Sequence, residues 1–84
     1  MGFYYITFRS VTHAQRGERM LSRQNLRVSL MRTPRWMEEQ GCGYAVKVWT
    51  NDIAAVVHLL REGKVQLRRV YSPRQDGGME EVNL

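Results

Sequence analysis

An alternating stretch opens the second half of the chain and reads Tyr44-Ala45-Val46-Lys47-Val48-Trp49. Its large apolar side chains recur at every second position, which is typical of a β-strand with one buried face. Thr50 or Asn51 can cap a helix over residues 53–62, Gly63 can end it, and an apolar run follows at residues 65–71. This half of the chain therefore predicts a strand, a helix and a strand.

The first half of the chain carries the same pattern. Residues 4–8 are apolar and rich in β-forming types, Ser10 can cap a helix that runs to about Gln24, and residues 26–31 alternate as a second strand. Thr33-Pro34-Arg35 after this strand matches Ser72-Pro73-Arg74 after the last one. The two halves read as a duplicated βαβ unit.

Two such units predict an α+β fold, a ferredoxin-like βαββαβ plait with a four-stranded antiparallel sheet and both helices on one face. The first and third strands are then central. The alternation assigns one set to the core face, namely Tyr4, Ile6, Phe8, Tyr44, Val46 and Val48. It leaves another set on the open face, namely Tyr5, Thr7, Arg9, Ala45, Lys47 and Trp49. The helices are expected to bury Ala14, Gly17 and Leu21, and Ile53, Val57 and Leu60.

The length of 84 residues is that of one small domain, which we place at residues 1–71. Residues 72–84 are mostly polar and are predicted to be a flexible C-terminal tail. No apolar run approaches the roughly 20 residues that cross a bilayer, and a single cysteine forms no internal disulfide. We therefore expect a cytoplasmic protein without membrane contact.

The chain is basic, with 13 Lys and Arg against 8 Asp and Glu and a net charge of +5. Such a balance favours polyanionic partners such as RNA. The arginines are spread along the chain, however, and a scattered basic surface more often serves solubility than binding.

Motifs for metal, nucleotide or hydrolytic chemistry do not occur in the chain. One cysteine and two distant histidines are too few for a zinc site, and the glycines do not form a dinucleotide or phosphate-binding loop. The adjacent Glu38 and Glu39 point in different directions in most backbone conformations, so they are a poor general acid and base pair. We expect no metal, no cofactor and no turnover enzyme.

Cys42 is the one cysteine, and it stands between Gly41 and Gly43 at the start of the alternating stretch. Flanking glycines leave room for a partner to approach the sulfur. The other interpretation is a small buried hydrophobe, which is the commoner fate of a free cysteine. From the residues alone both interpretations stay open.

The order of these features resembles a small bacterial family described as selenium or sulfur carrier proteins. The resemblance covers about residues 3–71 and rests on Tyr5-Ile6-Thr7-Phe8, Ser10, His13-Ala14, Leu21, Pro34-Arg35 and Cys42-Gly43-Tyr44-Ala45-Val46-Lys47. The combination of Pro-Arg, a short loop and Cys-Gly is its most specific element. The loop differs from the family's small hydroxyl residues, because it reads Trp36-Met37-Glu38-Glu39-Gln40-Gly41 here.

The resemblance implies a carrier that holds sulfur as a persulfide, or selenium as a selenosulfide, on Cys42. Its partners would be a cysteine desulfurase or a selenium donor, and an acceptor protein. An unperturbed thiol is only a few per cent thiolate at neutral pH, so nearby cations would help it react.

Arg35 is the first candidate for stabilising the thiolate, because a turn fixed by Pro34 can bring it back over Cys42. Arg32 and Lys47 are second candidates, and Glu38 and Glu39 act against them. His13, in the first turn of the first helix, is an accessory candidate together with Pro34, Gly41 and Gly43.

Two other classes of function stay open. Tyr5 and Trp49 on the open face can stack bases, as in an RRM-like module that binds single-stranded RNA. The chain can also be a protein-interaction module with no chemistry at Cys42, including a closed homodimer through the sheet.

Overall fold

The predicted strands and helices occur in the predicted order in the structure, a computed structural model that describes residues 2–33 and 43–83. The fold class is α+β. The elements are β1 (Phe3–Phe8), α1 (Val11–Arg23), β2 (Arg27–Arg32), β3 (Tyr44–Trp49), α2 (Ile53–Glu62), β4 (Val70–Pro73) and β5 (Met79–Glu81).

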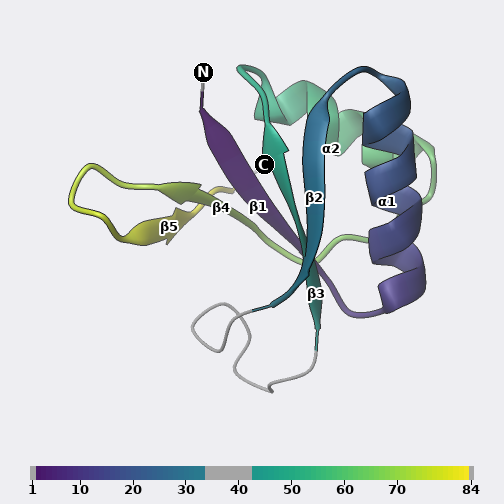
Figure 1. The fold of residues 1–84 in the computed structure, drawn as a ribbon, viewed down its shortest axis with the longest axis horizontal. Coiled ribbons are helices and arrows are strands. Elements are labelled where there is room, and N and C mark those ends of the chain that lie inside the picture. Colours follow the sequence, from purple (N-terminus) through teal and green to yellow (C-terminus); the bar gives the residue numbers. More distant parts are fainter. Residues whose placement is uncertain (1, 34–42, 84) are drawn as a thin grey trace.

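The strands form one antiparallel sheet in the order β2-β3-β1-β4-β5, with both helices on one face (Figure 1). We predicted four strands, and the described residues form five. Both predicted inner strands, β1 and β3, lie inside the sheet and pair over their whole lengths, from Phe3 opposite Trp49 to Phe8 opposite Tyr44. The sheet therefore brings the start of β3 to the end of β1.

The core face of the sheet is the one that the alternation predicts, whereas Thr7 and Ala45, which we predicted for the open face, are buried. Ile6 lies opposite Val46, Tyr4 lies opposite Val48, and these positions pack with the helices in one apolar core. The helices bury Ala14, Gly17 and Leu21 from α1, and Ile53, Val56, Val57 and Leu60 from α2. All of the predicted helix positions are thus confirmed, and Val56 joins them.

Both helices begin at a capping side chain and end in the same way. Ser10 Oγ accepts a hydrogen bond from His13 N at the start of α1, as predicted. The cap of α2 is Asp52, whose carboxylate accepts from Ala55 N, so our choice of Thr50 or Asn51 was wrong by one or two residues.

The helices end in Schellman motifs. Asn25 and Lys64 each take a positive φ, near 60°, and the next residues, Leu26 and Val65, donate back to Leu21 O and Leu60 O. Gly63 therefore marks the end of α2 as expected, but the left-handed position falls on Lys64.

The last predicted strand, residues 65–71, begins later than expected. Arg68 N donates to Thr7 O and Thr7 N donates to Arg69 O, so two successive residues oppose the single residue Thr7. This is the arrangement of a β-bulge, in which the extra residue interrupts the ladder. Regular pairing with β1 starts only at Val70.

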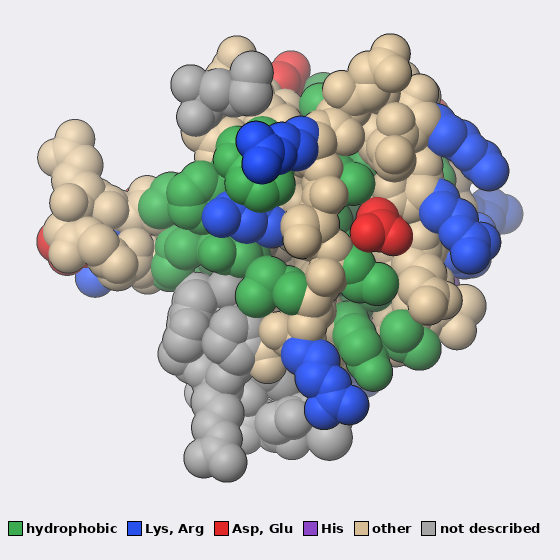
Figure 2. Space-filling model, in the orientation of Figure 1, with side chains coloured by type: hydrophobic (Ala, Val, Ile, Leu, Met, Phe, Trp, Pro, Cys, Tyr) green, Lys and Arg blue, Asp and Glu red, His purple; other side chains and the backbone are tan. Residues whose placement is uncertain are grey.

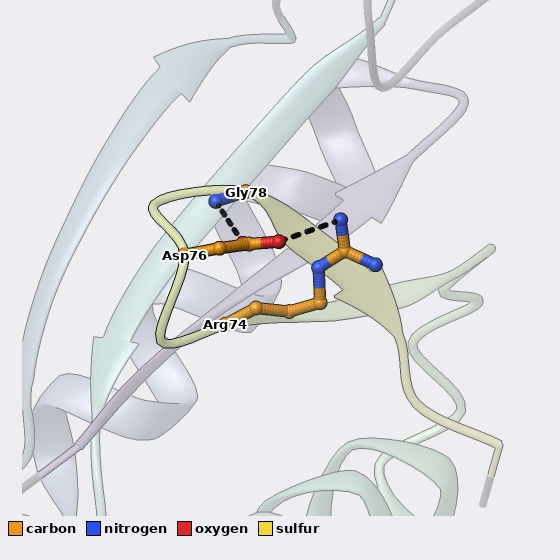
Figure 3. Close-up of polar contacts among 3 residues, drawn as sticks. All are labelled: Arg74, Asp76 and Gly78. Atoms are coloured by element: carbon orange, nitrogen blue, oxygen red, sulfur yellow. Dashed lines mark hydrogen bonds and ion pairs between the residues drawn. The ribbon is translucent and has the colours of Figure 1, made fainter.

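Residues 72–84, predicted as a loose tail, contain a fifth strand. β5 pairs with β4, and Val82 N donates to Val70 O at 2.7 Å while its side chain packs on the core. The turn between the strands is held by Asp76, which accepts from Gly78 N at 2.8 Å and pairs with Arg74 (Figure 3). Our placement of the domain at residues 1–71 stays a prediction.

Candidate functional site

The candidate site lies at the end of the sheet where β3 begins. Gly43 is the described residue next to Cys42 in the sequence, and its carbonyl accepts a hydrogen bond of 3.1 Å from Thr33 N, at the end of β2. Arg32 precedes Thr33 and lies opposite Tyr44. Two of the predicted site residues, Arg32 and Gly43, are thus brought to one end of the sheet.

Four other predicted site residues lie outside the described residues, namely Pro34, Arg35, Gly41 and Cys42. Their roles stay predictions. The described residue on the β2 side, Thr33, has a hydroxyl that is shielded from solvent and finds no hydrogen-bond partner in the part of the chain that the structure describes.

A pocket of about 460 Å³ opens between the end of β1 and the segment that precedes β4. Its lining residues are Arg9, Ser10, His13, Gln66, Leu67, Arg68 and Arg69. Three of these are arginines and none is acidic. The pocket therefore has the composition of a site for an anion.

The pocket and Gly43 belong to the same end of the sheet. Arg9 directly follows Phe8, and Phe8 lies opposite Tyr44, the residue after Gly43. Arg9 and Gly43 are therefore the residues just beyond the same end of the β1–β3 pairing. The cationic pocket thus lies at the end of the sheet where the sequence leads from β3 back to Cys42.

His13 lines the pocket from the first turn of α1. Its Nδ1 accepts a hydrogen bond of 3.2 Å from Gln66 N, so this ring nitrogen carries no proton and the proton of the neutral ring sits on Nε2. The first turn of α1 has no acidic residue. His13 therefore adds a donor group at a helix end that itself favours anions.

Thr7 ties the arginines of the pocket to β1. Its hydroxyl accepts a hydrogen bond of 3.1 Å from Arg69 N, next to the two backbone hydrogen bonds that Thr7 makes with Arg68 and Arg69. The bulge thereby presents the successive residues Arg68 and Arg69 to the same pocket. Sequence reasoning missed Arg9, Arg68 and Arg69, because nothing in their spacing indicates that they meet.

Lys47 lies away from this end of the sheet, three residues along β3 from Tyr44, a rise of about 10 Å. Its Nζ lies 4.2 Å from the ring centroid of Phe3, 4.7 Å from that of Trp49 and 5.7 Å from that of Tyr5. Its role as a second candidate beside Cys42 stays a prediction, and the structure gives it aromatic neighbours.

The described residues offer neither a metal site nor a membrane span. Within residues 2–33 and 43–83, no three His, Cys, Asp or Glu side chains gather as metal ligands. Neither helix in this part of the chain has the length and apolarity needed to cross a bilayer.

A comparison with family models matches residues 3–72 to the family described as "Putative Se/S carrier protein-like". The chain belongs to this family. The match begins with β1 and ends within β4, so it includes the pocket, Cys42 and both helices, and it leaves β5 outside. The Se/S carrier-like assignment confirms the resemblance seen in the sequence. Searches of curated proteins and of solved structures found no match.

Proposed function

We propose that this protein carries sulfur or selenium on Cys42, as a persulfide or a selenosulfide. The observation that carries the proposal is membership of the Se/S carrier-like family in a chain with a single cysteine. Sulfane sulfur transfer needs one thiol at the carrier, so a lone cysteine suffices.

The transfer balances without any external oxidant. The Cys42 thiolate attacks the outer sulfur of a donor persulfide, a new S–S bond forms at Cys42, and the donor cysteine leaves as a thiolate. An acceptor nucleophile then attacks the same outer sulfur, and Cys42 leaves as a thiolate. Selenium follows the same path when the donor presents it at the same oxidation level, as a selenosulfide.

The cationic pocket supports this chemistry in a second way. A persulfide anion and a thiolate are both stabilised by nearby positive charge, and Arg9, His13, Arg68 and Arg69 line a pocket at the end of the sheet where Gly43 begins the approach to β3. The donor is a cysteine desulfurase or a selenium-loaded protein, and the acceptor is a further protein.

We also infer that β1 to β4 and the two helices follow the ferredoxin-like plan, with β5 as an addition at the edge. The strand order β2-β3-β1-β4 within the larger sheet supports this inference. In such a plan the β2–β3 connection, which contains Cys42, belongs to an end of the sheet and not to its core.

Intact-mass measurement tests the proposal. The purified protein is incubated with a cysteine desulfurase and free cysteine and then freed of small thiols. We expect the added mass of one sulfur atom on the native protein and none on Cys42→Ser. No added mass on the native chain, or the same addition on Cys42→Ser, would refute the carrier function.

A matched pair of arginines on β2 tests whether positive charge at the cysteine end matters. Arg32 and Arg27 stand at opposite ends of this strand, and both are exposed. We expect Arg32→Gln to slow iodoacetamide labelling of Cys42 in the native protein severalfold, and Arg27→Gln to leave the rate unchanged. Labelling that requires denaturation would instead identify Cys42 as a buried thiol.

A further inference from the structure

The open face of the sheet carries a group of aromatic and basic side chains at the end away from Gly43. We call it the aromatic face, and it consists of Phe3, Tyr5, Arg27, Lys47 and Trp49. Phe3 lies opposite Trp49, and Tyr5 lies opposite Lys47, so all five side chains come from β1, β2 and β3 on the side that the helices do not cover.

The aromatic face is accessible, whereas the other end of the same sheet face is not. Thr7 and Ala45, at the Gly43 end, are 2% and 0% exposed. Phe3, Lys47 and Trp49 are partly exposed, and Arg27 is exposed. Figure 2 shows hydrophobic side chains gathered around Lys and Arg side chains between β2 and the β4–β5 hairpin.

The rings are held close together without stacking on one another. The centroids of Phe3 and Tyr5 are 5.6 Å apart with nearly perpendicular planes, and those of Phe3 and Trp49 are 6.3 Å apart with tilted planes. The flat faces of Phe3 and Trp49 are occupied by Lys47, and Arg27 lies 4.7 Å from the Trp49 centroid. Each of the three rings that could stack a base, those of Phe3, Tyr5 and Trp49, thus has the ammonium group of Lys47 close to it.

The charge of this surface is entirely positive over three strands. β1, β2 and β3 contain no acidic residue. Within the register of the described strands, the row that contains Tyr5 and Lys47 continues through Tyr71 to an acidic residue, Glu81 on β5. A net charge of +5 over the chain adds to the attraction for a polyanion.

We infer that the aromatic face binds single-stranded RNA. Bases stack on aromatic rings and phosphates pair with the basic side chains beside them, which is the combination this face provides. Cation–π contacts at partly exposed sites are weak, so the long side chains of Lys47 and Arg27 can leave the rings for phosphates as bases take their place.

RNA fits better than DNA because of Ser29. This residue is exposed in the middle of β2 and lies opposite Lys47 on the same face. Its hydroxyl can donate to and accept from a ribose 2′-OH, the group that distinguishes RNA from DNA. None of these residues lines the cationic pocket, and Lys47 alone is also a candidate for stabilising the Cys42 thiolate. The inference can be tested apart from the carrier function, because substitutions at Trp49 and Arg27 leave Lys47 and Cys42 in place.

Fluorescence anisotropy with a labelled uridine decamer tests the inference. We expect Trp49→Ala to weaken binding about tenfold. Arg27→Gln should reduce the slope of log affinity against log salt by about 0.7, the value for one lost phosphate contact. Arg23→Gln, an equal charge change on α1, should leave both quantities nearly unchanged. If Trp49→Ala does not fold, Trp49→Leu keeps the apolar contact and removes the stacking surface.

Three outcomes would overturn the inference. One is equal weakening by Arg23→Gln and Arg27→Gln, since it would mean attraction by overall charge. Another is displacement of the labelled decamer by inorganic polyphosphate as effectively as by unlabelled decamer at equal phosphate concentration, which would mean that stacking adds no affinity. Equal affinity for a thymidine decamer would remove the assignment to RNA.

Discussion

Thr7 offers the sharpest test of how the fold builds the cationic pocket. It is 2% exposed, and its hydroxyl accepts from Arg69 N at 3.1 Å and reaches Arg69 O at 3.4 Å. Thr7→Val keeps the shape of the side chain and removes only the hydroxyl. The variant therefore loses both hydrogen bonds of the Thr7 hydroxyl to the Arg69 backbone.

The magnitude follows from two opposing terms. Losing the two part-buried hydrogen bonds of the Thr7 hydroxyl costs about 1–3 kcal/mol in all, and burying a methyl in place of a hydroxyl returns about 0.8 kcal/mol. We expect Thr7→Val to lower the free energy of unfolding by about 0.2–2 kcal/mol. In a domain of this size each 1 kcal/mol corresponds to a fall in Tm of roughly 4–8 °C.

Thr7→Ser is the matched control, because it keeps the hydroxyl and loses the methyl. Urea unfolding followed by circular dichroism gives both free energies, and amide exchange reports on Arg69 alone. We expect exchange at the Arg69 amide to accelerate in Thr7→Val and to stay slow in Thr7→Ser. Unchanged Arg69 exchange in Thr7→Val would refute the reasoning, since the hydroxyl would then not hold the bulge.

Two further substitutions test the ends of elements. Lys64 takes a φ of 60° after α2, a backbone conformation that glycine adopts more readily than other residues. Lys64→Gly should therefore raise the free energy of unfolding, measured in urea, by about 0.5–1 kcal/mol. Lys64→Ala is the control and should give no gain. Gly77 takes a φ of 89° in the β4–β5 turn, so Gly77→Ala should cost about 1 kcal/mol and speed amide exchange at Val82. An unaffected Val82 amide would mean that the hairpin is not held by its turn.

Much of the fold was accessible from local patterns. The alternation along β1 and β3 placed Ile6 and Val46 in the core and Lys47 and Trp49 on the other face, because a strand has only two faces and one of them must be buried. The bounds of α2 followed from the apolar spacing and Gly63.

Our predictions differ from the structure where one local sequence pattern is compatible with more than one backbone conformation. Residues 65–69 look like a strand, but the bulge at Thr7 ends the regular ladder before Val70. The C-terminal segment is polar enough to read as a tail, yet Val82 finds a place on the core. Whether a single apolar residue in a polar segment is buried cannot be predicted from that segment, because it depends on the residues that surround it in the folded domain.

The sequence by itself determined the α+β class, the buried face of β1 and of β3, and the single cysteine on which the proposed carrier function rests, since these depend on residue type and on spacing within one element. The tertiary structure decided which cations share a pocket and which aromatic rings surround Lys47. Arg9 lies about 60 residues from Arg68 and Arg69 along the chain, and it joins them only because β1 pairs with the segment that leads into β4. Contacts of that kind arise from strand pairing across the whole domain, and no local pattern encodes them.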